Sequence, residues 1–75
     1  MYHCIQFTEE FTADIEISAR QPLERLLIRK GSRRRAQMRP YVIEAVGGPI
    51  EVADLFFEDG TATRGVPFSS FFFVQ

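Results

Sequence analysis

Alternation of apolar and polar residues is the feature that most limits the fold of this chain. From Phe11 to Ser18, apolar residues occupy every odd position and polar residues occupy every even one. This two-residue period is typical of a strand with one buried face and one face in water. Residues 2–8 show the same period more weakly. With Thr8-Glu9-Glu10 as the connection, the pattern predicts a hairpin within residues 1–20.

The segment that ends at Gly31 fits two interpretations. Pro22 at a first helical position, followed by leucines at helical spacing, predicts a short helix that stops at the glycine. Alternation of Leu26 and Ile28 instead predicts a strand, which turns at the glycine into a second strand. We favour the strand interpretation, which makes residues 25–39 a hairpin.

Turn signals divide the rest of the chain. Pro40 can lie in a strand only at an edge or a bulge, because proline cannot donate a ladder hydrogen bond. Gly47-Gly48-Pro49 predicts a turn, and a change of apolar phase near Ala53 indicates a β-bulge. Asp59-Gly60 is the strongest hairpin signal of the chain. The last residues predict one helical turn over Phe68-Ser69-Ser70 and then a strand from Phe71 to Val74.

Short strands at close spacing, with turn signals between them, predict a mostly β protein with a single domain, residues 1–75. Hydrophobic residues make up 45% of the chain and charged residues 25%, which is the composition of a folded globule rather than of a disordered chain. We expect a small barrel or a curled antiparallel sheet over residues 22–75. The N-terminal hairpin is an addition to this core, and at most one short helix is expected.

Three stretches carry a resemblance to a known fold. Ile28-Arg29-Lys30-Gly31-Ser32 combines an apolar strand with a glycine turn, residues 52–61 form a hairpin around an Asp-Gly turn, and residues 66–71 lead through a helical turn into a last strand. In this order they resemble the SH3-like small β-barrels. The resemblance implies a scaffold and not a ligand. Peptide-binding members of that superfamily carry acids near the first loop, where this chain has arginines.

Cysteine usage and the first residues predict a compartment. The lone cysteine, Cys4, cannot form an internal disulfide, which suits a reducing cytoplasm. The N-terminal residues lack the basic start and the apolar run of a signal peptide. No apolar run approaches the roughly 20 residues of a membrane-spanning helix. We therefore expect a cytoplasmic protein that makes no membrane contact.

Catalytic chemistry has few candidate groups. The single histidine and the single cysteine, His3 and Cys4, are neighbours in a predicted strand and so point to opposite faces. They supply neither a nucleophile with its base nor the four ligands that zinc needs. The paired acids Glu9-Glu10 and Glu58-Asp59 lie in predicted turns, outside any pocket that would tune them for acid–base work. We expect no enzyme, no catalytic residue, no metal and no cofactor.

Basic residues are concentrated in one segment. Seven of the nine fall within residues 25–39, which contain no acid. A field of that sign attracts phosphates or an acidic protein surface. In the predicted strand Arg33 and Arg35 face solvent, because Ala36 and Met38 take the other face. Arginine favours bidentate contacts with phosphate and stacking on bases. The first functional hypothesis is a binding module that contacts the backbone of RNA or DNA through Arg29, Lys30, Arg33, Arg34, Arg35 and Arg39.

A second interpretation neutralises the same residues within the fold. The ten acids lie before and after the basic segment, so cross-strand ion pairs with Glu16, Glu44 or Glu51 would occupy the arginines. Each exposed pair contributes roughly 0–1 kcal/mol to stability. In that case the basic segment is a solvated surface that has no ligand.

Phenylalanines crowd the end of the chain. Phe71, Phe72 and Phe73 are consecutive, so in a strand they cannot all face one core. Either the N-terminal hairpin covers the second face, or the exposed rings and a bare edge strand require a partner. The alternative function is an interaction or assembly module that forms a homodimer through these three residues. Its basic residues would then bind an acidic protein partner.

Overall fold

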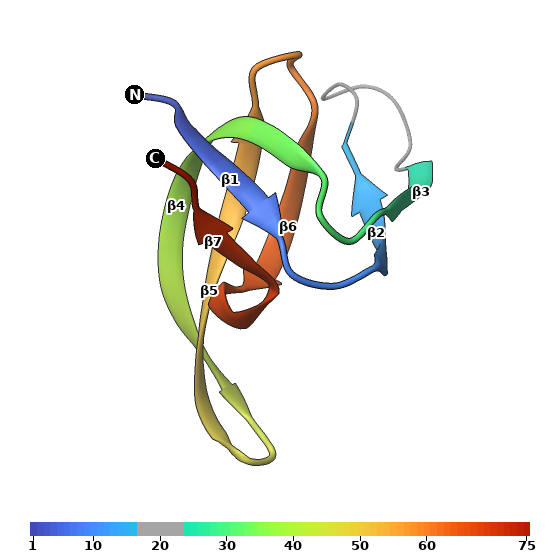
Figure 1. The fold of residues 1–75 in the computed structure, drawn as a ribbon. Helices are drawn as coiled ribbons and strands as arrows, with labels where there is room; N and C mark the ends of the chain where they lie inside the picture. Colours follow the sequence, from blue (N-terminus) through green and yellow to red (C-terminus); the bar gives the residue numbers. More distant parts are fainter. Residues whose placement is uncertain (17–23) are drawn as a thin grey trace.

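Seven short strands and one helical turn make up the structure, a computed structural model that describes residues 1–16 and 24–75 (Figure 1). The predicted mostly β fold is confirmed. Three residues of the sequence predictions, Ile17, Ser18 and Pro22, lie outside the described residues. In chain order the elements are β1 (His3–Phe7), β2 (Phe11–Ile15), β3 (Glu24–Ile28), β4 (Arg33–Ala45), β5 (Gly48–Phe57), β6 (Ala62–Pro67), the 3-10 turn η1 (Phe68–Ser70) and β7 (Phe71–Phe73).

Two antiparallel sheets contain the described strands. Five strands form one sheet in the order β6-β5-β4-β1-β7, and β2 pairs with β3 in a two-stranded sheet. A bridge between Glu16 and Ala62, with backbone hydrogen bonds of 2.9 and 2.7 Å, joins the end of β2 to the start of β6. Among the described residues the ladders do not close a barrel, since β7 pairs with β1 alone.

The predicted hairpin within residues 1–20 is wrong. Strand β1 pairs with β4 on one side and with β7 on the other, whereas β2 pairs with β3. The reason lies at Thr8, whose N–H and hydroxyl donate to the carbonyls of Ser70 and Ser69 (both 2.9 Å). The chain therefore leaves β1 along η1 and does not reverse on itself. The hairpin that the structure adds to the main sheet is β2–β3.

The basic segment is not a hairpin either, although its local structure was predicted correctly. Residues 24–28 form a strand and not a helix, and a turn follows at Lys30 and Gly31, where the glycine has φ of +83°. This turn carries the chain from one sheet to the other, because β3 pairs with β2 while β4 pairs with β1 and β5. The backbone groups of the turn bond across to Phe7: Gly31 N–H donates to its carbonyl, and the Ser32 carbonyl accepts from its N–H.

Pro40 lies inside β4, as an edge position allows. Glu58 N–H donates to the Arg35 carbonyl, so the odd-numbered residues of β4 make the ladder bonds to β5. Pro40 belongs to the alternate set, and its nitrogen faces the edge that β1 leaves uncovered beyond Ala36. No ladder bond is lost at the proline. The turn predicted at Gly47-Gly48-Pro49 lies one residue earlier, at Val46 and Gly47, since β5 begins at Gly48, and the turn predicted at Asp59-Gly60 is present.

A bulge lies near Ala53, as predicted, but its extra residue is in the partner strand β6 and not in the strand that shows the change of apolar phase. Ala53 pairs with Val66 and Leu55 pairs with Thr63, so two residues of β6 oppose the single residue Asp54. The extra residue therefore belongs to β6, where Gly65 has φ of +69°. This bulge aims two β6 groups, a backbone N–H and an arginine, at one carboxylate.

The core lies between the main sheet and the β2–β3 hairpin. Side chains from all seven described strands pack there, and Phe7 contacts Phe11 and Phe71 edge-on, with ring centroids 5.6 and 6.5 Å apart. Phe7 of β1 is buried beneath β2, from which Ile15 is also buried and Phe11 packs at the margin. The buried cluster comprises Ile5, Phe7, Ala13, Ile15, Ile28, Ala36, Ala53, Leu55, Phe57, Val66 and Phe71.

The far end of the β4–β5 ladder projects from this body as a two-stranded ribbon, residues 40–51, which we call the arm (Figure 1). Its strands pair only with each other, because β1 stops pairing with β4 at Ala36 and β6 begins to pair with β5 at Val52. Val42 and Ile43 are 58% and 41% exposed, and Val46 at the tip is fully exposed. The arm therefore presents apolar side chains to solvent.

Candidate interaction surfaces

The face of the main sheet that points away from the core carries the predicted arginines. Along β4, Arg33, Arg35 and Arg39 are exposed on this outer face, whereas Ala36 is buried and Met38 half-buried on the inner face. The predicted orientation of Arg33 and Arg35 toward solvent is confirmed. Arg34 points inward at the margin, where its guanidinium lies 5.0 Å from the centroid of the Phe57 ring.

Three of the six predicted binding residues form ion pairs with carboxylates. Arg35 Nε lies 3.2 Å from Glu58 Oε2, and Arg34 Nη1 lies 3.9 Å from Asp59 Oδ2. These partners differ from the predicted glutamates because β5 ends beside Arg35, so the residues of the β5–β6 turn are the nearest acids. Arg39 is held by the buried Asp54, described below. Pairing with neighbours therefore removes much of the net charge of the basic segment.

Asp54 is a buried carboxylate on the outer face, with a side chain only 2% exposed. Its Oδ2 accepts hydrogen bonds from Arg39 Nη2 at 2.9 Å and from Arg64 Nη1 at 3.2 Å. Its Oδ1 accepts from the Tyr41 hydroxyl at 2.8 Å and from the Gly65 N–H at 3.0 Å. The bulge brings Arg64 and Gly65 opposite this carboxylate, so both of its oxygens are satisfied.

Ionisation of Asp54 is favoured despite its position. Burial of the carboxylate opposes the charged form, but the hydrogen bonds from Tyr41, Gly65 and Arg39 outweigh burial, so the pKa of Asp54 lies below its ordinary value. The same bond raises the pKa of the Tyr41 hydroxyl, since loss of its proton would place two negative charges together. The cluster is therefore a satisfied structural anchor that holds Arg39, Arg64 and Tyr41 in place.

Sequence reasoning missed Asp54 and Arg64. The signal was present, because Asp54 is the one charged residue in the run from Val52 to Phe57 and stands at the change of apolar phase. A carboxylate in such a run is buried only when it is paired. Arg64 carried no local signal: its partners, Asp54 and Glu16, are ten and 48 residues away along the chain.

Three basic residues keep no carboxylate partner among the described residues. Arg29 and Lys30 lie exposed in the turn before β4 and make no ion pair within the described part of the chain. Arg33 Nε donates to the neutral Gln6 Oε1 at 2.8 Å. The hydrogen bonds between this turn and Phe7 place all three residues at one end of β1.

The C-terminal phenylalanines divide between core and surface. Phe71 is 4% exposed and belongs to the core, while Phe72 and Phe73 are 47% and 52% exposed. Phe73 packs edge-on against His3, with ring centroids 5.6 Å apart. Phe72 lies on the outer face opposite Gln6, which itself lies opposite Arg33. Phe72, Gln6 and Arg33 thus form a row across β7, β1 and β4, with an exposed aromatic ring at one end and a cation at the other.

We call this surface the corner: Phe72, Gln6 and Arg33, with Arg29 and Lys30 in the adjoining turn. It combines an exposed apolar ring, unpaired cations and the uncovered edge of β7, which has β1 as its single neighbour in the described structure. One residue of the predicted interface, Phe72, and part of the predicted binding segment therefore come together, although they lie about forty positions apart in the sequence. Arg34, Arg35 and Arg39 lie farther along β4 and are paired with carboxylates.

Catalytic groups are sparse in the described part of the chain. His3 is exposed and Cys4 is half-buried on the other face of β1, as alternation in a strand requires. Residues 1–16 and 24–75 contain no cluster of three His, Cys, Asp or Glu side chains that could hold a metal ion. They also contain no helix with the length and hydropathy needed to cross a bilayer.

Comparison with known proteins adds no further assignment. No family model matches the chain, and neither a curated protein nor a solved structure matches it. The fold shown is a small, mostly β, antiparallel one. Function therefore has to be argued from the surfaces themselves.

Proposed function

We propose that the chain is a small non-catalytic interaction module that binds an acidic, apolar segment of a protein partner at the corner. The observation that carries the proposal is the row from Phe72 through Gln6 to Arg33, with Arg29 and Lys30 beside it. An exposed aromatic ring next to cations suits a partner that offers apolar side chains and carboxylates together.

The uncovered edge of β7 supports a partner that binds in extended form. A strand with one neighbour leaves backbone N–H and C=O groups for a further strand. Phe72 and Phe73 then supply side-chain contacts on the two faces of the added strand, because consecutive strand residues point to opposite faces. Electrostatic attraction to the cations would speed encounter and help to fix the orientation of the partner.

Nucleic-acid binding is the second candidate, favoured by one observation. Arg33, Arg35 and Arg39 share the outer face at alternate positions of β4, with Tyr41 next in line. Exposed ion pairs such as Arg35 with Glu58 are worth roughly 0–1 kcal/mol, so a phosphate could replace the carboxylate. The argument is weaker than for a protein partner, because the neighbouring acids already neutralise most of this face.

An SH3-like barrel forms part of the proposal for the scaffold. The order of a glycine turn, a long strand, an Asp-Gly hairpin, a Val-Pro step, a 3-10 turn and a last strand supports it. The described strands, however, do not close into a barrel.

Two labelled probes in one anisotropy titration test the proposal. The first is a twelve-residue peptide that alternates glutamate with isoleucine, and the second is a twenty-nucleotide single-stranded RNA. We expect the peptide to bind, and we expect the triple variant R29E/K30E/R33E and the variant F72K each to weaken it at least tenfold. The matched control for the single corner variant R33E is R25E, which makes the same change of charge at an exposed residue that pairs with Asp14 away from the corner.

Two results would contradict the proposal. The first is RNA binding with a steep salt dependence and no peptide binding, which assigns the face to phosphates. The second is peptide binding that R25E weakens as much as R33E does, because binding would then follow net charge alone.

A further inference from the structure

The arm carries five apolar side chains that the described part of the fold leaves exposed. Tyr41, Val42, Ile43, Val46 and Ile50 are all exposed within ten positions. A two-stranded ribbon has little stability of its own in water, and exposed apolar patches of this kind usually mark an interaction site. The arm therefore needs an explanation beyond the folding of one chain.

Proline protects both edges of the arm, which leaves its faces as the available surface. Pro40 in β4 and Pro49 in β5 both belong to pairs that make no ladder bonds, so their nitrogens face the two free edges. A further strand would find no N–H donor at either place. A partner of the arm therefore has to contact its side chains.

The two faces of the arm differ in chemistry. Ile43 pairs directly with Ile50 on the outer face, which gives this side a continuous apolar surface. Glu44 and Glu51 lie on the reverse face with Val42, both exposed and without an ion pair in the described part of the chain. Residues 40–51 contain no Lys or Arg at all. The reverse face, with Val42, Glu44 and Glu51, is therefore both apolar and acidic, as the corner requires of its ligand.

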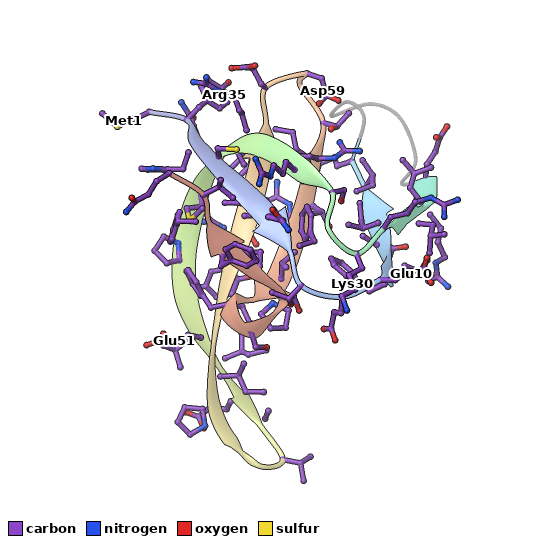
Figure 2. The ribbon with its side chains drawn as sticks, viewed as in Figure 1. Met1, Glu10, Lys30, Arg35, Glu51 and Asp59 are labelled. Atoms are coloured by element: carbon purple, nitrogen blue, oxygen red, sulfur yellow. The ribbon has the colours of Figure 1, made fainter. Side chains whose placement is uncertain are left out.

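Within one molecule the arm and the corner cannot meet. Glu44 lies eleven positions along β4 from Arg33, a separation of roughly 30 Å in a strand that rises about 3.3 Å per residue and is somewhat bent. Figure 2 shows Glu51 on the arm, well apart from Lys30. The complementary surface is available on another molecule.

We propose that the arm of a second copy of this chain occupies the corner, and that two copies exchange arms in a two-fold dimer. When two β4 strands run in opposite directions, the arm of each lies beside the basic end of the other, so both contacts form at once. The reverse face of the arm then docks, with Val42 packed on Phe72 and with Glu44 and Glu51 near Arg29, Lys30 and Arg33. This inference rests on the proposed function, since it names the partner of the corner.

A charge-exchange experiment on the full chain tests the dimer by sedimentation velocity between 10 and 500 μM protein. We expect the fraction of dimer in the parent protein to rise with protein concentration and to fall in high salt. The arm variant E44R/E51R and the corner variant R29E/K30E/R33E should each be monomeric. An equal mixture of the two variants should form a heterodimer, because each reversed arm then meets a reversed corner and each unchanged arm meets an unchanged corner.

Matched controls separate packing from charge and from unfolding. V42K should abolish the dimer, whereas L27K should leave it intact, since Val42 and Leu27 are similarly exposed, at 58% and 51%, and Leu27 lies on the other sheet. Far-UV circular dichroism and urea unfolding of each variant confirm that it is folded.

Three results would overturn the inference: a parent that is monomeric throughout, a dimer that survives V42K, or charge variants that do not form a dimer on mixing. Failure of the proposed function is distinguished by the peptide titration. Peptide binding by a monomeric parent would contradict only the exchange of arms. A dimer without peptide binding would contradict the proposal that the corner binds acidic, apolar segments of other proteins.

Discussion

One ladder, between β4 and β5, passes through two different environments. Inside the body β5 has neighbours on both sides, and Val52, Ala53, Asp54 and Leu55 are buried in succession, although alternate strand residues point to opposite faces. In the arm the same pairing continues, yet Ile43 and Ile50 are about 40% exposed. The difference shows that strand pairing alone buries little. Burial comes from the β2–β3 hairpin on one face and from the Asp54 cluster on the other.

The largest effect should come from truncating one apolar residue in each region. Leu55 is fully buried in the body, and Ile50 lies in the arm. We expect L55A to lower the free energy of unfolding by about 3 kcal/mol, through lost burial and the cavity left behind. I50A should cost less than about 1 kcal/mol, since its side chain is already half in water. Urea unfolding at a protein concentration where the chain is monomeric measures both.

Equal costs for the two variants would mean that the arm is packed as firmly as the body. The comparison between the two regions would then fail.

A second large effect should follow from the buried carboxylate. D54N keeps the shape of the side chain but removes the charge that binds Arg39 and Arg64. We expect a loss of about 2–3 kcal/mol in urea unfolding, because partners of a buried charge are left unsatisfied. D14N is the matched control, because Asp14 and Arg25 form an exposed pair whose loss should cost less than about 1 kcal/mol.

If D54N and D14N were equally mild, the Asp54 cluster would not be what covers the outer face of the body. Tyr41 offers a check on the same point, since Y41F removes one hydrogen bond to Asp54 and should cost about 1 kcal/mol.

Low pH should lower the stability of the body through protonation of Asp54. The pKa of Asp54 is lowered in the folded state, so its contribution to stability is fully present above the unfolded value of about 3.9 and is lost as pH falls through the folded value. The pKa of Asp59 is lowered in the same direction, because its carboxylate accepts bonds from the Thr61 hydroxyl and N–H. We expect the urea midpoint to fall from about pH 5 downward, and to fall less steeply in D54N.

A pH profile of D54N that ran parallel to the parent profile would assign the acid sensitivity to other carboxylates. Asp59 is then the next group to change, in the variant D59N.

Local elements were predictable from this sequence, because their signals are local. The strand at 24–28, the glycine turns, the bulge near Ala53 and the 3-10 turn at Phe68–Ser70 each follow from residues within a few positions. Strand partners were not predictable in the same way. The predicted hairpin within residues 1–20 failed because β1 is taken by β4 and β7, through hydrogen bonds at Thr8 and Phe7 to segments far along the chain.

In the candidate site, too, local features were predictable from the sequence and long-range contacts were not. Orientation of Arg33 and Arg35 toward solvent was predictable from alternation, but their partners were not, since Gln6 and Glu58 lie 27 and 23 positions away. The split of Phe71 from Phe72 follows from alternation too, once the strand is known. That Phe72 lies in a row with Arg33 depends on the register of two ladders, which no local pattern encodes.

The smallest effect on stability, and the most specific one for the arm, should come from its prolines. In P40T/P49T each free edge regains an N–H, while the ladder between β4 and β5 keeps all its bonds. Replacing proline raises the conformational entropy of the unfolded chain, so we expect the free energy of unfolding to fall by roughly 0.5–1 kcal/mol per site. The same change should make the arm prone to pair edge to edge with other copies, seen as growth of scattering at high concentration. The control is P67T, since Pro67 lies in β6 at the body and pairs with Val52. If P40T/P49T stayed as well dispersed as P67T, the prolines would not be what keeps the arm edges apart, and partners could reach the arm through its backbone as well as through its faces.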